Sequence, residues 1–285
     1  MFQHITIIGI GMIGGSVALA ARACGMAKKI TAMDISLSNL EWATESGMID
    51  GAVNDVGQSD LVVLAMPVGS YGTMMHKISE QLQPGALVTD VGSTKRSAMR
   101  DAAKYLPLGA FIGGHPIAGR EKHGPQHAQA GLFQGRWCIL TPPDDVAPTD
   151  IEKIQRLWEA MGSKVAIMDA AHHDRVLAIT SHLPQLIART IVGTAADLEK
   201  EMQEEVIQFS AGGFRDFTRM AAADPIMWRD IFLENKDAVL EMLQRLSEDI
   251  GVMQRHIRNG DGPALQDLFA RAQSIRQQVI DARQD

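Results

Sequence analysis

The sequence predicts an α/β protein in two parts: a doubly wound, mostly parallel sheet followed by an all-α segment. Over the first 168 residues, short apolar runs rich in β-branched residues alternate with helix-like segments. After Asp169 no further strand pattern appears, and apolar residues recur at spacings of three and four. A chain of 285 residues has room for two domains. We therefore expect a sheet domain over 1–168 and a helical domain over 169–285.

The first predicted strand, Ile5 to Ile8, leads directly into a glycine-rich turn and an alanine-rich helix. The turn holds Gly9, Gly11 and Gly14 in the spacing G-x-G-x-x-G. The first glycine permits a tight turn, the second lets a pyrophosphate approach the backbone, and the third lets helix and strand pack closely. The free N–H groups at the start of the helix suit phosphate oxygens.

A second strand, Lys29 to Met33, ends at Asp34, which follows Gly14 by 20 residues. This is the spacing of the acidic residue that binds the ribose 2′-hydroxyl in dinucleotide-binding domains. Because a carboxylate repels a 2′-phosphate, the sequence favours NAD over NADP. The order strand, glycines, helix, strand and acid predicts a Rossmann-type domain, whereas the glycine motif alone would be a weak signal.

Further apolar runs predict the remaining strands, at 61–66, 86–91, 110–114, 137–141 and 164–168. Helices are expected between them and after them, at 36–46, 69–81, 95–105, 151–161, 172–196, 199–210, 225–258 and 262–283. Ligands bind outside the carboxyl ends of the strands in such sheets. The positions expected to contact the cofactor are Gly9, Gly11, Met12, Ile13, Gly14, Asp34, Pro67 and Ser93.

One histidine is expected at the same edge of the sheet. His115 follows the strand at 110–114 and precedes Pro116 to Gly119, which is not expected to continue as a strand. An imidazole has an unperturbed pKa of about 6.5, which suits a proton acceptor at neutral pH. His115 is therefore a candidate base beside a bound nicotinamide.

The composition excludes several classes of partner. A net charge of −7 without a basic cluster argues against nucleic acid. The N-terminal apolar stretch contains too many glycines for a signal or membrane segment. Two cysteines, Cys24 and Cys138, fit a reducing compartment. We expect a cytoplasmic protein without a nucleic-acid or membrane partner, and without a metal site, since no HExxH motif occurs.

Three motifs carry a resemblance to a known family: HPIAG at 115–119, SHLP at 181–184 and GGFRDFTR at 212–219. Together with DPIMW at 224–228, they resemble the prephenate/arogenate (cyclohexadienyl) dehydrogenase family, TyrA, over nearly the whole chain. The resemblance implies NAD-dependent oxidative decarboxylation of prephenate or arogenate, with release of CO2 and NADH, in tyrosine biosynthesis. It also implies a homodimer formed through the helical domain. A monomer with an intramolecular bundle is the alternative.

The resemblance also implies roles for individual residues. His115 is the hydrogen-bonding partner and base for the ring hydroxyl, and Ser93 orients that hydroxyl and the imidazole. A serine there could instead cap a helix. Arg219 binds a substrate carboxylate through its guanidinium. The residues expected to contact substrate are Ser181, His182, Gln185, Arg219 and Glu121, with helix capping as the alternative for His182.

One position departs from the family pattern, which often has a histidine after SHLP. Here that position is Gln185, which can form hydrogen bonds but carries no charge. The choice between prephenate and arogenate therefore stays open. Because the chain ends soon after the helical region, inhibition by tyrosine is expected only at the active site.

Two other functions remain possible from the sequence. A dehydrogenase of the β-hydroxyacid type has a similar build, but it needs a lysine base for which no motif is found. A non-catalytic NAD-sensing protein would keep the cofactor signature alone, and the presence of Ser93, His115 and Arg219 together argues against it.

Overall fold

The computed structural model describes residues 1–119, 122–198 and 200–281. It divides into two compact units, Met1–Lys236 and Asp237–Asp285. The first unit holds the whole sheet and the helices up to residue 234. The domain boundary that the sequence predicts after residue 168 stays a prediction.

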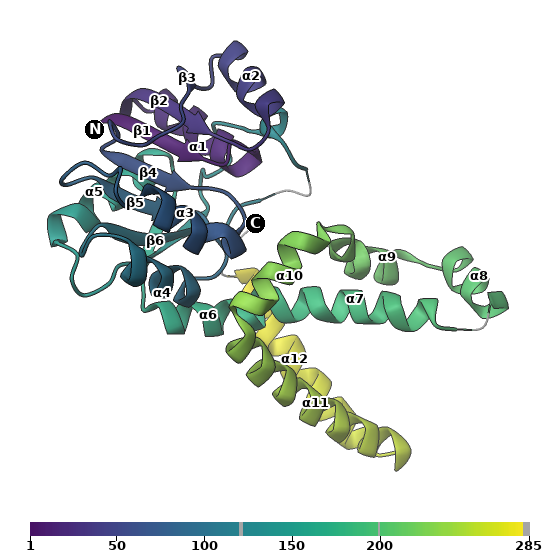
Figure 1. The fold of residues 1–285 in the computed structure, drawn as a ribbon. Coiled ribbons are helices and arrows are strands. Elements are labelled where there is room, and N and C mark those ends of the chain that lie inside the picture. Colours follow the sequence, from purple (N-terminus) through teal and green to yellow (C-terminus); the bar gives the residue numbers. More distant parts are fainter. Residues whose placement is uncertain (120–121, 199, 282–285) are drawn as a thin grey trace. The chain divides into compact units, whose positions relative to one another are not determined.

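In the described residues, eight strands form one sheet in the order β3-β2-β1-β4-β5-β6-β7-β8. Figure 1 labels the strands β1 to β6 of this sheet. Neighbouring strands are parallel from β3 to β6, β7 runs antiparallel to β6, and β8 is parallel to β7. This confirms a doubly wound, mostly parallel sheet. The two-residue β3 was not predicted because it is too short to form an apolar run. The strands are β1 Phe2–Ile8, β2 Ala27–Met33, β3 Gly51–Ala52, β4 Leu61–Leu64, β5 Leu87–Asp90, β6 Phe111–Pro116, β7 Trp137–Thr141 and β8 Lys164–Ile167.

Helices cover both faces of the sheet. Alternate residues of β1 face opposite ways, so that Ile7 packs in one core cluster and Ile8 in another. The first cluster includes Val17 of α1 and Trp158 of α5, and the second includes Met75 of α3. The helices of this part are α1 Met12–Ala23, α2 Leu37–Glu45, α3 Tyr71–Ile78, α4 Arg96–Tyr105 and α5 Pro148–Ala160.

The helical region after β8 is more interrupted than the sequence predicts. The helix expected over 172–196 is divided by a π-helical segment, Ala178–His182, because Pro184 cannot donate the backbone hydrogen bond of a regular helix. The helix expected over 225–258 is broken at Asn235, and α9 was not predicted. The helices are α6 Ala170–Leu177, α7 Leu183–Ala196, α8 Lys200–Gln208, α9 Gly212–Thr218, α10 Pro225–Glu234, α11 Lys236–Arg258 and α12 Gly262–Asp281.

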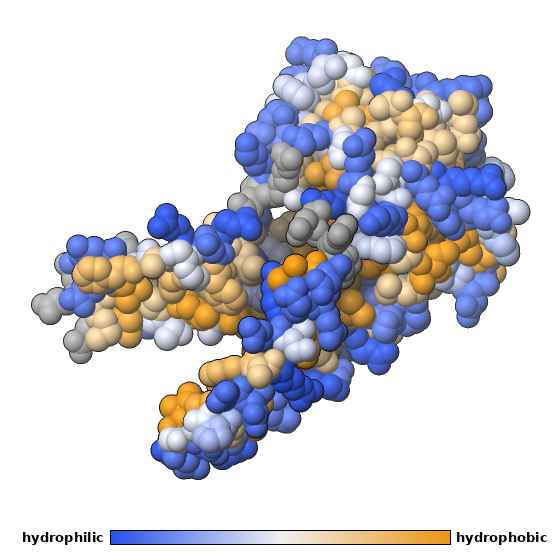
Figure 2. Space-filling view, turned by 180° about the vertical axis from the view of Figure 1, so that it is seen from behind, coloured by the Kyte–Doolittle hydropathy of each residue, from blue (hydrophilic) through white to orange (hydrophobic). Residues whose placement is uncertain are grey.

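Apolar side chains lie exposed along two helical segments, α7–α9 and α11–α12 (Figure 2). None of the helices in the described ranges is long and apolar enough to cross a membrane. The exposed apolar residues include Ile191, Val192, Met202, Phe209 and Phe217 in the first segment, and Leu240, Ile250, Ile257, Phe269 and Ile275 in the second.

A buried ion pair joins the end of β5 to the start of α4. Asp90 and Lys95 are both fully buried, and the Lys95 ammonium contacts the Asp90 carboxylate. The same ammonium donates a hydrogen bond to the Gly114 carbonyl at 2.6 Å. Asp90 accepts hydrogen bonds from the backbone N–H groups of Gly92 and Gly114, each at 2.9 Å. Each buried charge is therefore compensated by the other and by backbone groups of the neighbouring strand.

Replacing Lys95 by methionine should destabilise the protein by about 3–5 kcal/mol, because it leaves the Asp90 carboxylate buried without a counter-ion. Urea unfolding at pH 7 measures this change. Lys153→Met is the control, since Lys153 forms an exposed pair with Asp150 and its loss should cost about 1 kcal/mol or less. Equal destabilisation by the two variants would contradict the importance of the buried pair.

Candidate active site

The turn between β1 and α1 leaves room for a ligand at one glycine and for none at the other two. Gly9 has φ +96°, and a Cβ there would lie 2.7 Å from the Ala65 backbone. A Cβ on Gly14 would lie 2.1 Å from the Gly9 carbonyl oxygen, whereas a Cβ on Gly11 would meet nothing within 4 Å. Gly11 is also the N-cap of α1 and provides no side-chain cap for its first N–H groups. These N–H groups border open space and suit an anion.

Asp34 is held beside this turn at the end of β2. Its Oδ2 accepts a hydrogen bond from the Ile10 N–H at 2.7 Å, and its Oδ1 accepts one from the Ser36 N–H at 2.8 Å. The carboxylate is therefore fixed next to the glycines, where the sequence predicts that it binds a ribose. Asp34 fits that role, although it does not line the cleft described next.

A cleft of about 580 Å³ lies at the carboxyl ends of β1, β4 and β5. This size is typical of sites for small molecules and cofactors. The cleft brings together six of the predicted site residues, and Lys122 and the α10 residues Ile226 and Met227 also line it. A dinucleotide fits these features: open space over Gly11, uncapped N–H groups and an acid at the end of β2. The six predicted residues are Gly11, Met12, Ile13, Pro67, Ser93 and His115.

His115 lies inside a strand rather than after one, which corrects the expectation that the strand stops at residue 114. β6 leaves β5 after Ile112 and pairs with β7 through Pro116, so that His115 lies opposite Ile139. The Ile117 N–H donates to the Trp137 carbonyl. Because ladder hydrogen bonds alternate along an antiparallel pair, Pro116 falls at a position that needs no N–H donor. The proline therefore does not end the strand.

The imidazole of His115 is buried and hydrogen-bonded to a second histidine. His115 Nδ1 lies 2.8 Å from His173 Nε2, and the rings meet edge-on with centroids 5.1 Å apart. His173 Nδ1 in turn lies 2.8 Å from Asp174 Oδ1. His173 and Asp174 were not among the site residues predicted from the sequence. Their proximity to His115 depends on the packing of α6 at the site, which no local motif reveals.

Burial keeps these histidines uncharged at neutral pH. The pKa of His115 lies well below its ordinary value, first because of burial and then because of the nearby His173, Lys95 and His182. Burial also lowers the pKa of His173. His115 therefore enters the cleft as a neutral imidazole that can accept a proton.

Ser93 lines the cleft and does not cap α4. That helix begins at Arg96, and its N-cap residue, Lys95, makes no side-chain capping bond. The N–H groups of Lys95 and Arg96 donate instead to the two carboxylate oxygens of Asp174, at 2.8 and 2.9 Å. The capping alternative for Ser93 is therefore wrong, and its role beside the cofactor stays a prediction.

His182 is fully buried between α6 and α10 and does not cap a helix either. Its Nδ1 accepts a hydrogen bond from Asn235 Nδ2 at 3.1 Å, and the same amide donates to the Asp174 carbonyl at 2.8 Å. Burial lowers the pKa of His182 to about 4. Its Nε2 is buried and has no partner among the described residues. His182 therefore presents a neutral N–H donor.

Gln185, on α7, helps to hold the turn that contains Arg219. Gln185 Nε2 donates to the Met220 carbonyl at 2.7 Å, and Arg189 Nη2 donates to the Ala223 carbonyl at 2.7 Å. Arg219 lies in this turn and is exposed. Ser181, His182, Gln185 and Arg219 do not line the cleft that contains His115, and Glu121 lies outside the described residues. Their predicted contacts with substrate stay predictions.

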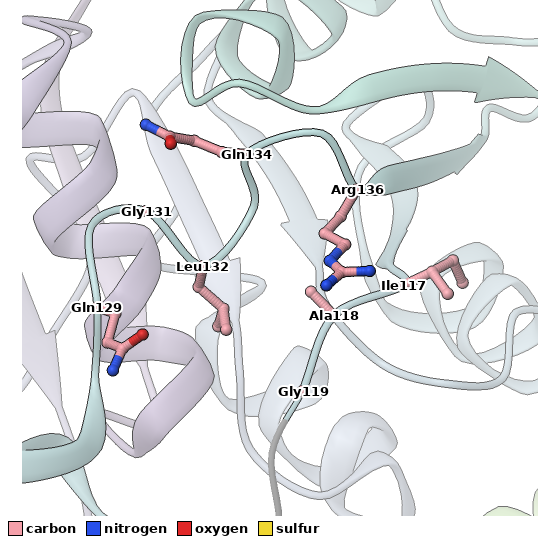
Figure 3. Close-up of a pocket in the computed structure, with 8 residues that line it drawn as sticks. All are labelled: Ile117, Ala118, Gly119, Gln129, Gly131, Leu132, Gln134 and Arg136. Carbon is pink, nitrogen blue, oxygen red and sulfur yellow. The ribbon is translucent and has the colours of Figure 1, made fainter. Parts of the chain in front are cut away.

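A second cavity of about 350 Å³ adjoins the segment that follows His115 (Figure 3). It shares Ala118 and Gly119 with the larger cleft. Arg136 and Gln129 contribute polar side chains to its lining (Figure 3). No sequence motif predicted this cavity.

Comparison with known proteins identifies the family to which this chain belongs. A protein-family model described as prephenate dehydrogenase, nucleotide-binding domain, matches residues 17–167. A second family model, described as prephenate dehydrogenase, dimerization domain, matches residues 169–271. The chain belongs to the prephenate dehydrogenase family. Its membership confirms the resemblance found in the sequence and places the chain among NAD-dependent oxidoreductases.

Relatives within the prephenate dehydrogenase family match almost the whole chain. A cyclohexadienyl dehydrogenase of Zymomonas mobilis is 36% identical over 97% of this chain and 96% of its own length. A prephenate dehydrogenase of Bacillus subtilis is 33% identical, over 97% of this chain and 76% of its own length. The crystal structure of prephenate dehydrogenase from A. aeolicus, in complex with hydroxyphenyl propionate and NAD+, has a TM-score of 0.92 and 33% identity. It covers 98% of this chain and 99% of that chain.

Substitution by alanine should have different effects at two glycines of the turn, Gly11 and Gly14. Gly11→Ala should leave stability within about 1 kcal/mol, a helix-cap effect, while weakening NAD binding at least tenfold, because the added methyl occupies the open space. Gly14→Ala should instead lower the melting temperature, because its Cβ clashes with the Gly9 carbonyl. Calorimetry of NAD binding and thermal unfolding separate the two effects. Unchanged NAD affinity in Gly11→Ala would place the cofactor elsewhere.

Proposed function

We propose that this chain catalyses the NAD-dependent oxidative decarboxylation of prephenate, arogenate or both, and thereby serves tyrosine biosynthesis. The observation that carries the proposal is His115, a buried neutral imidazole that lines a cleft with dinucleotide-binding features. Relatives named prephenate and cyclohexadienyl dehydrogenase, and a structural neighbour bound to NAD+ and a hydroxyphenyl acid, support it.

When bound, NAD+ supplies the hydride acceptor for the ring carbon that carries the hydroxyl. His115 Nε2 takes the proton of that hydroxyl, so that the O–H bond breaks, an N–H bond forms and the oxygen becomes a carbonyl. The bond to the ring carboxylate then breaks with loss of CO2, its electrons enter the ring, and the oxygen takes a proton back from His115 to become a phenol. Because this restores an aromatic ring, the protein need not drive that step strongly. The task of the chain is to position the hydroxyl and to hold an unprotonated nitrogen against it.

The remaining polar residues suit substrate binding. Ser93 lines the same cleft as His115 and orients the hydroxyl. Arg219 binds a substrate carboxylate, and the two hydrogen bonds from α7 to its turn support that role by limiting the positions of the turn. The unpartnered N–H of His182 supports a further contact with substrate. Ser181, Gln185 and Glu121 complete the proposed set.

Gln185 favours arogenate over prephenate. Its Nε2 is engaged by the Met220 carbonyl, so the atom left for a substrate is Oε1, which only accepts hydrogen bonds. Oε1 is not among the buried polar atoms that lack a partner. The ammonium group of arogenate donates hydrogen bonds, whereas the keto oxygen of prephenate accepts them. An acceptor at this position therefore matches arogenate.

The assembly and location follow the same family. We propose a homodimer formed through a helical domain over 169–285, supported by the match to a dimerization domain and by the exposed apolar residues of α7–α9 and α11–α12. Tyrosine, the product formed from arogenate, inhibits by occupying the active site. The preference is for NAD, because the fixed Asp34 carboxylate lies beside the glycine turn. The protein acts in the cytoplasm.

His115→Asn should lower kcat by about 10²- to 10⁴-fold, because it removes the base, while NAD affinity stays unchanged. Formation of NADH followed by absorbance, together with calorimetry of NAD binding, measures both. In the parent enzyme, activity should persist as the pH falls through about 6.5 and decline only at lower pH, since the lowered pKa of His115 keeps the base unprotonated there. A parent that forms no NADH from either substrate supports the non-catalytic alternative instead, and unchanged kcat in His115→Asn removes the residue from the mechanism.

The two substrates test the role of Gln185. The parent should show a higher kcat/KM with arogenate than with prephenate, and Gln185→Met should reduce that ratio about tenfold, because a hydrogen bond to a charged group is lost. Gln155→Met on α5 is the control, since Gln155 bonds only to Glu159 at the surface. A parent that prefers prephenate, or an unchanged ratio in Gln185→Met, would contradict this assignment.

A further inference from the structure

We infer that Asp174 and His173 form a hydrogen-bonded relay that fixes His115 in the one neutral tautomer able to accept a proton from the cleft. The inference rests on the proposed function only for the identity of the proton donor. It assigns positioning roles to two buried residues that the sequence analysis did not include in the site. The relay runs from the N-terminus of α4, through α6, to β6.

The first step concerns the protonation of Asp174. Two backbone N–H groups donate to its carboxylate, Lys95 N–H at 2.8 Å to Oδ1 and Arg96 N–H at 2.9 Å to Oδ2, and His173 Nδ1 lies 2.8 Å from Oδ1. Because each carboxylate oxygen already accepts a hydrogen bond from a backbone N–H, a proton on either oxygen would compete with that donor. The carboxylate is therefore ionised and accepts hydrogen bonds only. Its place at the start of α4 favours a negative charge.

The second step sets the direction of the two bonds between the rings. Because Asp174 only accepts, His173 carries its proton on Nδ1 and leaves a lone pair on Nε2. That lone pair can meet His115 Nδ1 at 2.8 Å only if Nδ1 carries the proton of His115. In a neutral imidazole the other nitrogen is then an acceptor. His115 Nε2 is therefore the unprotonated nitrogen.

The third step places that nitrogen in the cleft. Nε2 forms no hydrogen bond within the described ranges, and it is not among the buried polar atoms without a partner. His115 lines the cleft, so Nε2 is the atom that remains for a ligand. In the opposite tautomer this atom would carry a hydrogen and could not take a proton. The choice of tautomer therefore decides whether His115 can act as a base.

The backbone of His115 is fixed independently of the relay. The Gly114 N–H, in the residue directly before it, donates to Asp90, and the Gly114 carbonyl accepts from Lys95. The charged and titratable groups around the imidazole are Lys95 and Asp90 beside β5, His173 and Asp174 on α6, and His182. Loss of His173 should therefore change the tautomer of His115 without releasing its strand.

Two substitutions of His173 distinguish a role in the relay from a role in packing alone. His173→Leu removes the acceptor for His115 Nδ1, whereas His173→Gln keeps both an acceptor and a donor. We expect His173→Leu to lower kcat by about 10²- to 10⁴-fold, as expected when an imidazole is left in the wrong tautomer, with substrate KM and NAD affinity changed less than threefold. His173→Gln should recover most of the lost kcat. His172→Gln, at an exposed neighbouring position, is the control and should match the parent.

A measurement that does not depend on turnover tests the relay separately from the proposed function. Nitrogen NMR of the histidine-labelled protein with NAD+ bound reports which ring nitrogens carry protons. The relay predicts Nδ1–H and bare Nε2 for His115 in the parent and in His173→Gln, and loss of this preference in His173→Leu and Asp174→Asn. A bare Nδ1 in the parent overturns the inference, as does a His173→Leu variant with kcat within threefold of the parent. A parent with the predicted tautomer but no activity would contradict only the proposed function.

Discussion

The site depends on how the backbone of Gly114, directly before His115, is held. Both of its polar backbone groups are bound, since the Gly114 N–H donates to Asp90 and the Gly114 carbonyl accepts from Lys95. Both side chains are buried and paired with each other, so neither can turn to solvent without leaving a buried charge behind. This clamp fixes the backbone from which the imidazole enters the cleft. The loop after β5 and the strand β6 are thereby joined by the same two residues.

The same segment links the sheet to the helical residues that follow it. The N–H groups of Lys95 and Arg96, which a serine cap could have satisfied locally, bind the Asp174 carboxylate of α6 instead. Asn235 continues this connection, because its side-chain amide reaches both the Asp174 carbonyl and His182. The break between α10 and α11 therefore has a structural reason. Buried polar groups from widely separated parts of the chain satisfy one another around His115.

Local chemistry explains what could be predicted from the sequence. The glycine turn, Asp34 and the strands of the sheet follow from short-range patterns, and so does the position of His115 near the carboxyl edge. His173, Asp174 and Asn235 could not be identified, because their roles come from contacts with residues 53 to 79 positions away. Pro116 was expected to end β6, but its missing N–H matters only at alternate positions of an antiparallel pair. The motif at 212–219 pointed to Arg219, whereas only the structure shows that hydrogen bonds from α7 hold its turn.

The central claim is that the unprotonated Nε2 of His115 receives the proton of the substrate's ring hydroxyl. A crystal structure of the protein with NAD+ and a 4-hydroxyphenyl product analogue tests it most directly. The account predicts the hydroxyl oxygen at about 2.6–3.2 Å from His115 Nε2. A hydroxyl bound to another side chain, with His115 turned away from the cleft, would contradict it.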